Sequence, residues 1–164
     1  MPAVNTDMPT ITPSLWFDDN LEAAAQFYTA VFPNSTIENV NRYTEAGPGT
    51  PGEVASATFV LDGNRFIGIN GGPQFGFTEA VSFVVVCQDQ QEIDYYWNRL
   101  TEGGEESQCG WLKDRYGLSW QIVPSRLYEL LDDPDPACAA AAAAAMLGMR
   151  KIVIADLEAA VRDG

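Results

Sequence analysis

The sequence contains no histidine, and this absence removes several common kinds of catalytic and metal site. Imidazole is the commonest general base in enzymes and the commonest transition-metal ligand in proteins. Basic residues are also scarce, because 9 Lys and Arg stand against 23 Asp and Glu and leave a net charge of −14. A surface this acidic opposes nucleic acid and anionic membranes as partners, and it favours cationic or neutral molecules.

Cysteine is rare, with three residues far apart in the chain: Cys87, Cys109 and Cys138. Their number is odd and they form no CxxC pair, so the sequence predicts neither a disulfide framework nor a zinc knuckle. No apolar run is long enough to cross a membrane, and the N-terminal segment MPAVNTDMP lacks the basic and apolar regions of a signal peptide. We therefore expect a cytoplasmic protein with no membrane partner.

The remaining composition is that of a globular protein, with 46% hydrophobic residues in a chain of 164. This length suits one compact domain with a substantial core. ITPSLWF (11–17) alternates like a half-buried strand, and apolar residues at helical spacing predict a helix over 21–32. Asp18, Asp19 and Asn20 lie where this helix needs an N-cap.

Further strands follow this first helix. TIENVNRY (36–43) predicts a strand, and 53–72 predicts a hairpin that turns at Asp62-Gly63. The loop 45–52 between them holds three glycines and two prolines. This loop is either a lid over a cavity or a plain connection.

The same order of elements then begins again. AVSFVVVC (80–87) predicts a strand, and Asp89 with Glu92 predicts the capped start of a helix. ESQCGWLKD (106–114) predicts one strand, and a turn at 116–117 leads into the last strand.

An offset of 69 residues superimposes the two helical segments, with Phe27-Tyr28 falling on Tyr96-Trp97. The shared order of elements around these aromatic pairs predicts an internal duplication with two copies.

The chain from Ser125 onward predicts helices. Ser125 can cap the first, and Asp135-Pro136 starts a second that carries the alanine run 139–145. An alanine buries little area, so the run either lies against a flat surface such as a partner subunit or is simply of low complexity.

Four ordered segments, ITPSLWFDD, FYTAVFPNS, NGGPQFGFTEAVSF and WLKDRYGLSWQIVP, together resemble the PhnB-like branch of the vicinal oxygen chelate superfamily. Members of this branch often carry the label 3-demethylubiquinone-9 3-methyltransferase. The resemblance implies an α+β fold in which two βαβββ modules, 10–73 and 74–124, form an incomplete barrel around a cavity. The helical extension 125–164 completes the expected single domain, and the pairing of such modules in this superfamily implies a homodimer.

The resemblance also implies where relatives hold a metal. The first-strand ligand falls near Thr12 or Ser14, the fifth-strand ligand near Ser82, the last-strand glutamate on Gln121 and the fourth ligand around 68–70. Neutral hydroxyls and amides hold Zn²⁺, Mn²⁺ or Fe²⁺ poorly, so we expect no metal and no cofactor. The same groups suit a cavity that binds a neutral organic ligand.

The last strand of the second module also predicts a polar residue that faces a cavity. Its alternation puts Gln121 on the face opposite Trp120 and Ile122, and a buried amide there needs partners or a cavity. Trp120 is expected in the core, whereas Trp16 and Trp111 are either cavity aromatics or further core residues. The candidate cavity residues are Thr12, Ser14, Trp16, Asn70, Ser82, Trp111 and Gln121.

Two classes of function are compatible with the sequence. One is metal-independent binding of a small organic molecule, with an aromatic or cationic ligand suited to the tryptophans and the negative charge. The other is an enzyme, either acting on a quinone or phenol or using a glyoxalase-type or dioxygenase-type site with a non-standard metal. Methyltransferases that use S-adenosylmethionine usually have a glycine-rich turn inside a doubly wound sheet, and the sequence shows no such unit.

Overall fold

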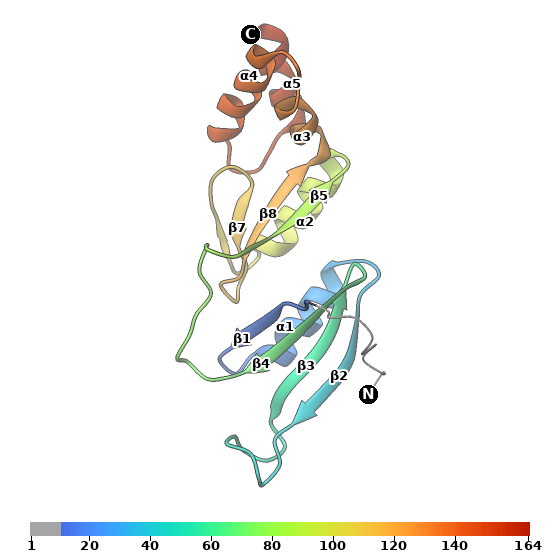
Figure 1. Ribbon diagram of the computed structural model, residues 1–164, viewed down its shortest axis with the longest axis vertical. Coiled ribbons are helices and arrows are strands. Elements are labelled where there is room, and N and C mark those ends of the chain that lie inside the picture. Colours follow the sequence, from blue (N-terminus) through green and yellow to red (C-terminus); the bar gives the residue numbers. More distant parts are fainter. Residues whose placement is uncertain (1–10) are drawn as a thin grey trace. The chain divides into compact units, whose positions relative to one another are not determined.

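The computed structural model describes residues 11–164, which form two compact units (Figure 1). The first unit ends at Gly76, and the second unit comprises Phe77–Gly164. Each unit contains one four-stranded mixed sheet and a helix between the first and second strands of that sheet.

The first unit has the order βαβββ that its sequence predicts. Its elements are β1 (Ser14–Phe17), α1 (Leu21–Val31), β2 (Thr36–Arg42), β3 (Val54–Leu61) and β4 (Asn64–Asn70). The sheet order is β1-β4-β3-β2, in which β1 pairs with β4 in parallel and the other pairs are antiparallel.

The second unit repeats this arrangement. Its corresponding elements are β5 (Ser82–Cys87), α2 (Gln90–Thr101), β6 (Glu105–Glu106), β7 (Trp111–Lys113) and β8 (Ser119–Pro124). The sheet order β5-β8-β7-β6 matches that of the first unit, and β5 pairs with β8 in parallel. Tyr28 and Trp97, which the 69-residue offset superimposes, are both buried. The repeated βαβββ order confirms the predicted α+β fold of two modules.

Each sheet has one buried face and one face without a helix. In the first sheet Phe17, Phe59 and Phe66 are buried on the side of α1, and the ring of Tyr28 stacks on that of Phe59 at 6.4 Å between centroids. In the second sheet the buried side carries Trp120, which confirms its predicted core position. We call the opposite sides, which carry no helix of their own module, the helix-free faces. In the second sheet this side holds Ser119, Gln121 and Val123, and its Val123 end is covered by the C-terminal helices.

The segment 106–114 differs from its prediction as a single strand. It forms β6 and β7, separated by a turn in which Cys109 has φ 58° and Gly110 has φ 82°. The N–H groups of these two residues donate to the carbonyls of Met149 and Arg150, each at 2.8 Å. A distant segment of the chain therefore hydrogen-bonds the turn between β6 and β7, and local sequence does not reveal this contact.

The start of α1 also differs from prediction. Asn20 occupies the N-cap position but makes no side-chain cap bond, and the acidic pair before it provides none. Instead, the N–H of Leu21 donates to Oδ1 of Asn70 at 3.0 Å. The same amide donates through Nδ2 to the Val54 carbonyl at 3.0 Å, so one side chain from β4 joins α1 and β3. The start of α2 is as predicted, because Asp89 accepts from the Glu92 N–H at 2.9 Å.

Three helices follow β8 and have their own core. They are α3 (Ser125–Leu131), α4 (Pro136–Leu147) and α5 (Ile154–Asp163). Ser125 is the first residue of α3 and makes no cap bond, whereas Asp135 caps α4 by accepting from the Ala137 N–H at 2.9 Å. The core of this extension consists of Val123, Leu127, Leu130, Ala142, Ile152 and Leu157. Within residues 11–164, none of the helices has the length and apolar character that crossing a membrane requires.

Gln90 attaches the C-terminal extension to α2. Its Nε2 donates to the Ile152 carbonyl at 3.0 Å, and its Oε1 accepts from the Ile154 N–H at 2.9 Å. Lys151 adds an ion pair with Asp94 at 2.8 Å. Both ends of this amide are thus used by the backbone of one distant segment.

A buried carboxylate organises the turn between β7 and β8. Asp114 is 3% exposed, and its Oδ1 accepts from the N–H groups of Tyr116 and Leu118 at 2.8 and 3.1 Å. Its Oδ2 accepts from Nε1 of Trp120 at 2.9 Å. A buried charge is tolerated only when hydrogen bonds replace water, and three donors do so here.

We expect Asn70→Ala to lower the free energy of unfolding by about 2 kcal/mol, because it leaves both the Leu21 N–H and the Val54 carbonyl without their partner. Urea unfolding followed by circular dichroism measures this. Asn64→Ala is the matched control: Asn64 is the exposed first residue of β4, its amide makes only two long hydrogen bonds to the carbonyls of Leu61 and Asp62, at 3.4 and 3.2 Å, and its loss should cost less than about 0.5 kcal/mol. Equal effects for the two variants would contradict the role of Asn70.

We expect Asp114→Ala to lower the free energy of unfolding by about 3 kcal/mol, since three donors lose a charged acceptor in a buried site. Asp114→Asn should be intermediate, because the new amide nitrogen cannot accept from Trp120. Asp163→Ala, in the exposed last turn of α5, serves as the control. A near-neutral Asp114→Ala in urea unfolding would show that water replaces the carboxylate.

Candidate functional site

The helix-free face of the second sheet brings three of the predicted site residues together. Nε2 of Gln121 on β8 donates to Oγ of Ser82 on β5 at 2.9 Å. Trp111 on β7 lies directly opposite Gln121 in the antiparallel register. Among residues 11–164, none donates to the amide oxygen of the half-buried Gln121. A polar pair beside an indole with a spare acceptor is a surface that a small organic molecule can bind.

A small cavity of about 100 Å³ lies in this second unit. Lys113 forms an ion pair with Glu79 at 2.6 Å, and this contact raises the pKa of the lysine and lowers that of the glutamate. The cavity is lined by Glu79, Glu105, Glu106, Ser107, Trp111, Leu112, Lys113 and Ser119. Three carboxylates and one ammonium group give this lining a net negative charge.

The predicted residues of β1 lie in the first unit. Ser14 is exposed, and Thr12 precedes the strand and is half-buried. The indole of Trp16 has both a hydrogen-bond partner and a ring contact. Its Nε1 donates to the Gly72 carbonyl at 2.9 Å, and its ring meets Phe75 edge-on at 5.0 Å between centroids. The connection after β4 therefore packs on Trp16, which has a structural role in this unit.

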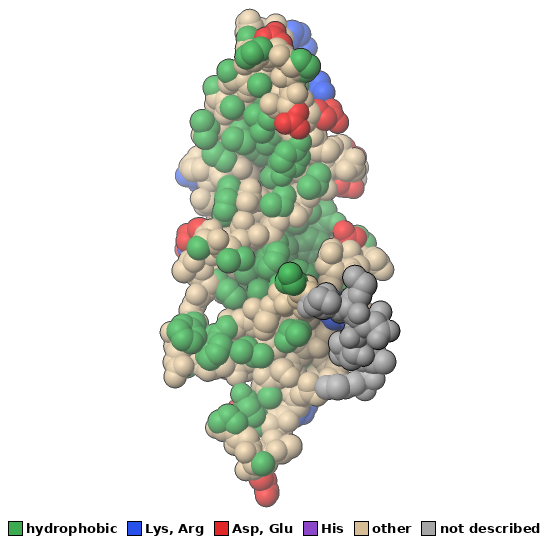
Figure 2. Space-filling model, viewed as in Figure 1, with side chains coloured by type: hydrophobic (Ala, Val, Ile, Leu, Met, Phe, Trp, Pro, Cys, Tyr) green, Lys and Arg blue, Asp and Glu red, His purple; other side chains and the backbone are tan. Residues whose placement is uncertain are grey.

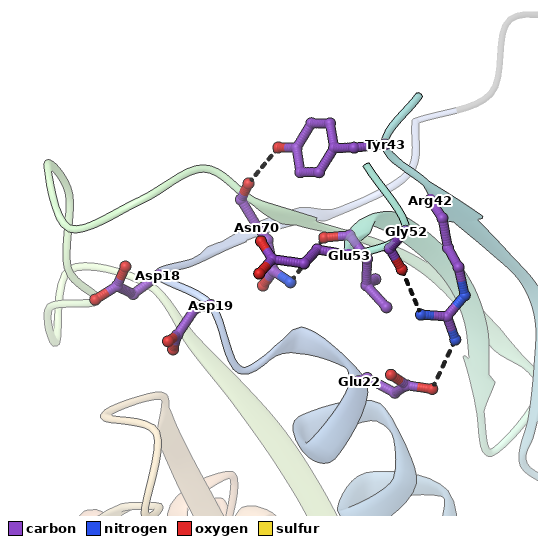
Figure 3. Close-up of a pocket in the computed structure, with 9 residues that line it drawn as sticks. Asp18, Asp19, Glu22, Arg42, Tyr43, Gly52, Glu53 and Asn70 are labelled. Atoms are coloured by element: carbon purple, nitrogen blue, oxygen red, sulfur yellow. Dashed lines mark hydrogen bonds and ion pairs between the residues drawn. The ribbon is translucent and has the colours of Figure 1, made fainter. Parts of the chain in front are cut away.

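Asn70 lines a cavity of the first unit, and Gln121 is among the lining residues neither of that cavity nor of the cavity of about 100 Å³. The cavity that Asn70 lines has a volume of about 470 Å³ (Figure 3). Its lining consists of Asp18, Asp19, Glu22, Arg42, Tyr43, Gly52, Glu53, Val54 and Asn70. Four carboxylates and one guanidinium give it a negative field that favours cations and opposes anions.

Sequence reasoning assigned Asp18 and Asp19 to capping and so missed their place in this cavity. Their carboxylates are left for the cavity because Asn70, from β4, bonds the first N–H of α1. The only available signal was the number of acidic residues near this helix start, which equally suits a cap.

The loop after β2 is attached to this cavity at two points. Nη1 of Arg42 donates to the Gly52 carbonyl at 3.1 Å, and Nη2 contacts Oε1 of Glu22 at 3.4 Å (Figure 3). The hydroxyl of Tyr43 donates to the Asn70 carbonyl at 2.9 Å. A side chain at Gly49 would overlap the Tyr43 ring, so the loop packs closely on that ring.

The side chains at the metal positions implied by the superfamily do not fit a metal ion. Ser82 and Ser14 are hydroxyls and Gln121 is a neutral amide. Around 68–70 the chain offers only the amide of Asn70, which already bonds Leu21 and Val54. Without a carboxylate or an imidazole these positions lack the charge that divalent metals need. Across residues 11–164, no three Cys, Asp or Glu side chains are grouped so that they could hold a metal.

Two of the three cysteines, Cys87 and Cys138, are poor candidates for a nucleophile. All three are free. Burial, with smaller contributions from Glu92 and Asp89, raises the pKa of Cys87 to about 12. Burial and the nearby Asp135 and Asp133 also raise the pKa of Cys138. A thiol that stays protonated at neutral pH is a poor nucleophile.

The chain is similar to several known proteins. The family model described as 3-demethylubiquinone-9 3-methyltransferase matches residues 9–123, so α3 to α5 lie outside the match. The PhnB protein from Bacillus cereus is 37% identical with a TM-score of 0.66, over 71% of this chain and 100% of that one. No curated protein matches the sequence.

Two more distant structures share the fold alone. The protein PA1353 from Pseudomonas aeruginosa is 20% identical with a TM-score of 0.59, over 71% of this chain and 98% of that one. The fosfomycin resistance protein FosX from Mesorhizobium loti is 13% identical with a TM-score of 0.56, over 76% of this chain and 98% of that one. The protein therefore belongs to the 3-demethylubiquinone-9 3-methyltransferase family, the PhnB-like branch of the vicinal oxygen chelate superfamily.

Proposed function

We propose that this protein binds a small organic molecule on the helix-free face of the second sheet, and that it does so without a metal ion. The observation that carries the proposal is the Gln121–Ser82 hydrogen bond of 2.9 Å. It pairs two neutral side chains at positions where metal-dependent relatives are expected to hold charged ligands. The amide oxygen of Gln121 remains available to accept a hydrogen bond from a ligand.

Charge and aromatic content support a cationic or aromatic ligand. Trp111 lies beside Gln121, and an indole face attracts cations and stacks on flat rings. The nearby cavity adds the carboxylates of Glu79, Glu105 and Glu106. The net charge of −14 further raises the local concentration of cations.

The family description names a methyl transfer, but the fold supports binding better. Proteins that bind S-adenosylmethionine or dinucleotides in doubly wound folds use consecutive parallel strands and a helix N-terminus at the switch point. Within residues 11–164 each sheet contains only one parallel pair, β1 with β4 or β5 with β8. An enzyme acting on a quinone or phenol is the second candidate, because Gln121 could hydrogen-bond a carbonyl or hydroxyl of such a molecule.

We also propose a cytoplasmic homodimer. The helix-free faces carry exposed apolar side chains, with Ile67, Val84 and Val86 between 36% and 49% exposed, and hydrophobic side chains are visible on the surface of both units (Figure 2). Apolar surface of this kind is typical of an interface. Three free cysteines suit a reducing compartment.

The ligand is best sought by native mass spectrometry of protein purified from its own host. This measurement reports the mass of a bound metabolite, the metal content and the number of subunits together. A bound organic molecule without metal supports the proposal. Close to one equivalent of zinc, manganese, nickel or iron per chain would overturn it.

We expect Gln121→Ala to change the free energy of unfolding by less than about 1 kcal/mol, because water can replace a half-buried amide on an open face, while binding of the host metabolite weakens. Gln90→Ala is the matched control, since the Gln90 amide bonds two backbone groups and its loss should cost about 2 kcal/mol. Thermal unfolding and metabolite titration measure the two effects. Severe destabilisation by Gln121→Ala would place this residue in the packed core.

We expect Gln121→Glu to fold and to gain at most weak metal affinity, since one carboxylate among hydroxyls and amides is too few donors. Zn²⁺ or Mn²⁺ at about 0.1 mM should therefore raise the midpoint of thermal unfolding by less than about 2 °C. A large metal-dependent rise in this variant, absent from the wild type, would reveal a latent metal site.

We expect light scattering to give twice the chain mass of 17.9 kDa. The exposed apolar residues Val84 and Val86 lie on the same face as Gln121, so a second copy that packs on them would also help to enclose the ligand. Val84→Lys should shift the equilibrium toward monomer. Leu147→Lys places the same charge on an exposed residue of α4, outside this face, and should leave the equilibrium unchanged. A strictly monomeric wild type at tens of micromolar, roughly the weak-dimer range, would contradict the homodimer.

A further inference from the structure

Ser119 on β8 is a buried hydroxyl without a hydrogen-bond partner. The residue is 1% exposed, and among residues 11–164 no donor or acceptor reaches its Oγ. Burying an unpaired hydroxyl costs free energy, so most buried hydroxyls in proteins are paired. Ser119 also lines the cavity of about 100 Å³ in the second unit. An unpaired buried hydroxyl beside a cavity indicates that a ligand or a water molecule in the cavity forms its hydrogen bond.

The polar neighbours of Ser119 on the same face are already engaged. Lys113, its antiparallel partner in the register, directs its ammonium group to Glu79 at 2.6 Å. Ser82, its parallel partner, accepts from Gln121 at 2.9 Å. Lys113 and Ser82 therefore have partners other than Ser119. The hydroxyl of Ser119 can bond only a molecule in the cavity.

The cavity lining suits a positive group. Glu106 is engaged with Nε1 of Trp97 at 3.0 Å, and Glu79 with Lys113. Among residues 11–164 the carboxylate of Glu105 forms no hydrogen bond or close ion pair; it lies opposite Lys113 in the β6–β7 register, and, after Glu79, its charge contributes to the raised pKa of that lysine. Because the ammonium group of Lys113 contacts Glu79 directly, the Glu105 carboxylate can still accept a positive group at the cavity.

We propose that this cavity is a subsite for a primary ammonium group of a small organic amine. The hydroxyl of Ser119 accepts one N–H of the ammonium group, Glu105 supplies the compensating charge, and the indole of Trp111 offers a cation–π surface. A volume of about 100 Å³ admits an ammonium group with a short alkyl chain. This inference rests on the proposed ligand binding at the second sheet and names the chemical class of that ligand.

The test uses ethylammonium chloride as the probe and the whole protein, with amide chemical shifts as the readout. Ethylammonium should bind in the millimolar range and shift resonances of β7 and β8. Ser119→Ala should weaken the binding about tenfold, since it removes one hydrogen bond to a charged donor. Ethanol, which is neutral, and tetramethylammonium, which has no N–H, should bind at least tenfold more weakly than ethylammonium.

Ser56→Ala, a serine of β3 in the first unit, is the matched control and should leave ethylammonium binding unchanged. Without ligand, Ser119→Ala should leave the midpoint of thermal unfolding unchanged or raise it, because the lost hydroxyl has no partner. A lowered midpoint would show a structural partner for Ser119 and overturn the proposal.

Equal ethylammonium affinity in the wild type and Ser119→Ala would also overturn the subsite. If the host metabolite still binds in that case and Gln121→Ala weakens it, the proposed function stands while the ammonium subsite fails. If no metabolite binds but ethylammonium depends on Ser119 and Glu105, as shown by Glu105→Gln, the subsite is supported on its own.

Discussion

Parallel pairing of the first and last strand of each module determines which face of its sheet the helix covers and which face can hold a site. Parallel strands cannot be joined by a tight turn, so the chain must cross over between β1 and β4 and again between β5 and β8. Each crossover includes one helix, which packs on one face of its sheet. The other face carries polar and apolar side chains that the helix of the module does not cover, although the C-terminal helices pack on Val123 in the second unit. The candidate site on the second sheet is one consequence of this arrangement.

A few polar side chains hold these modules together by completing backbone hydrogen bonds. Asn70 joins α1 to β3 and β4, Asp114 organises the β7–β8 turn, and Gln90 attaches the C-terminal extension. Each is partly or fully buried, and each has partners for its functional group. Ser119 is different, because its buried hydroxyl has no partner among residues 11–164. That contrast separates a structural polar group from one that awaits a ligand.

The absence of histidine shapes the chemistry of the site. Where the superfamily is expected to hold a metal, this chain offers a serine and a glutamine that hydrogen-bond each other. Neutral donors bind organic molecules well and divalent metals poorly. Acidic residues gather at two cavities, one in each unit, so both cavities have a field that favours cations.

Periodicity and turn residues sufficed to predict the first βαβββ module, the duplication between Tyr28 and Trp97, and the core position of Trp120, because these signals are local. For the second module they predicted one strand where the structure has β6 and β7. Tertiary structure decided the rest. The cap of α1 comes from Asn70, 49 residues away, and this freed Asp18 and Asp19 to line a cavity. The strand expected over 106–114 is divided by a turn, and a segment beyond α4 hydrogen-bonds that turn. Such pairings depend on groups that meet only after folding, and the unpaired hydroxyl of Ser119 could be recognised only once its neighbours had been seen to bond one another.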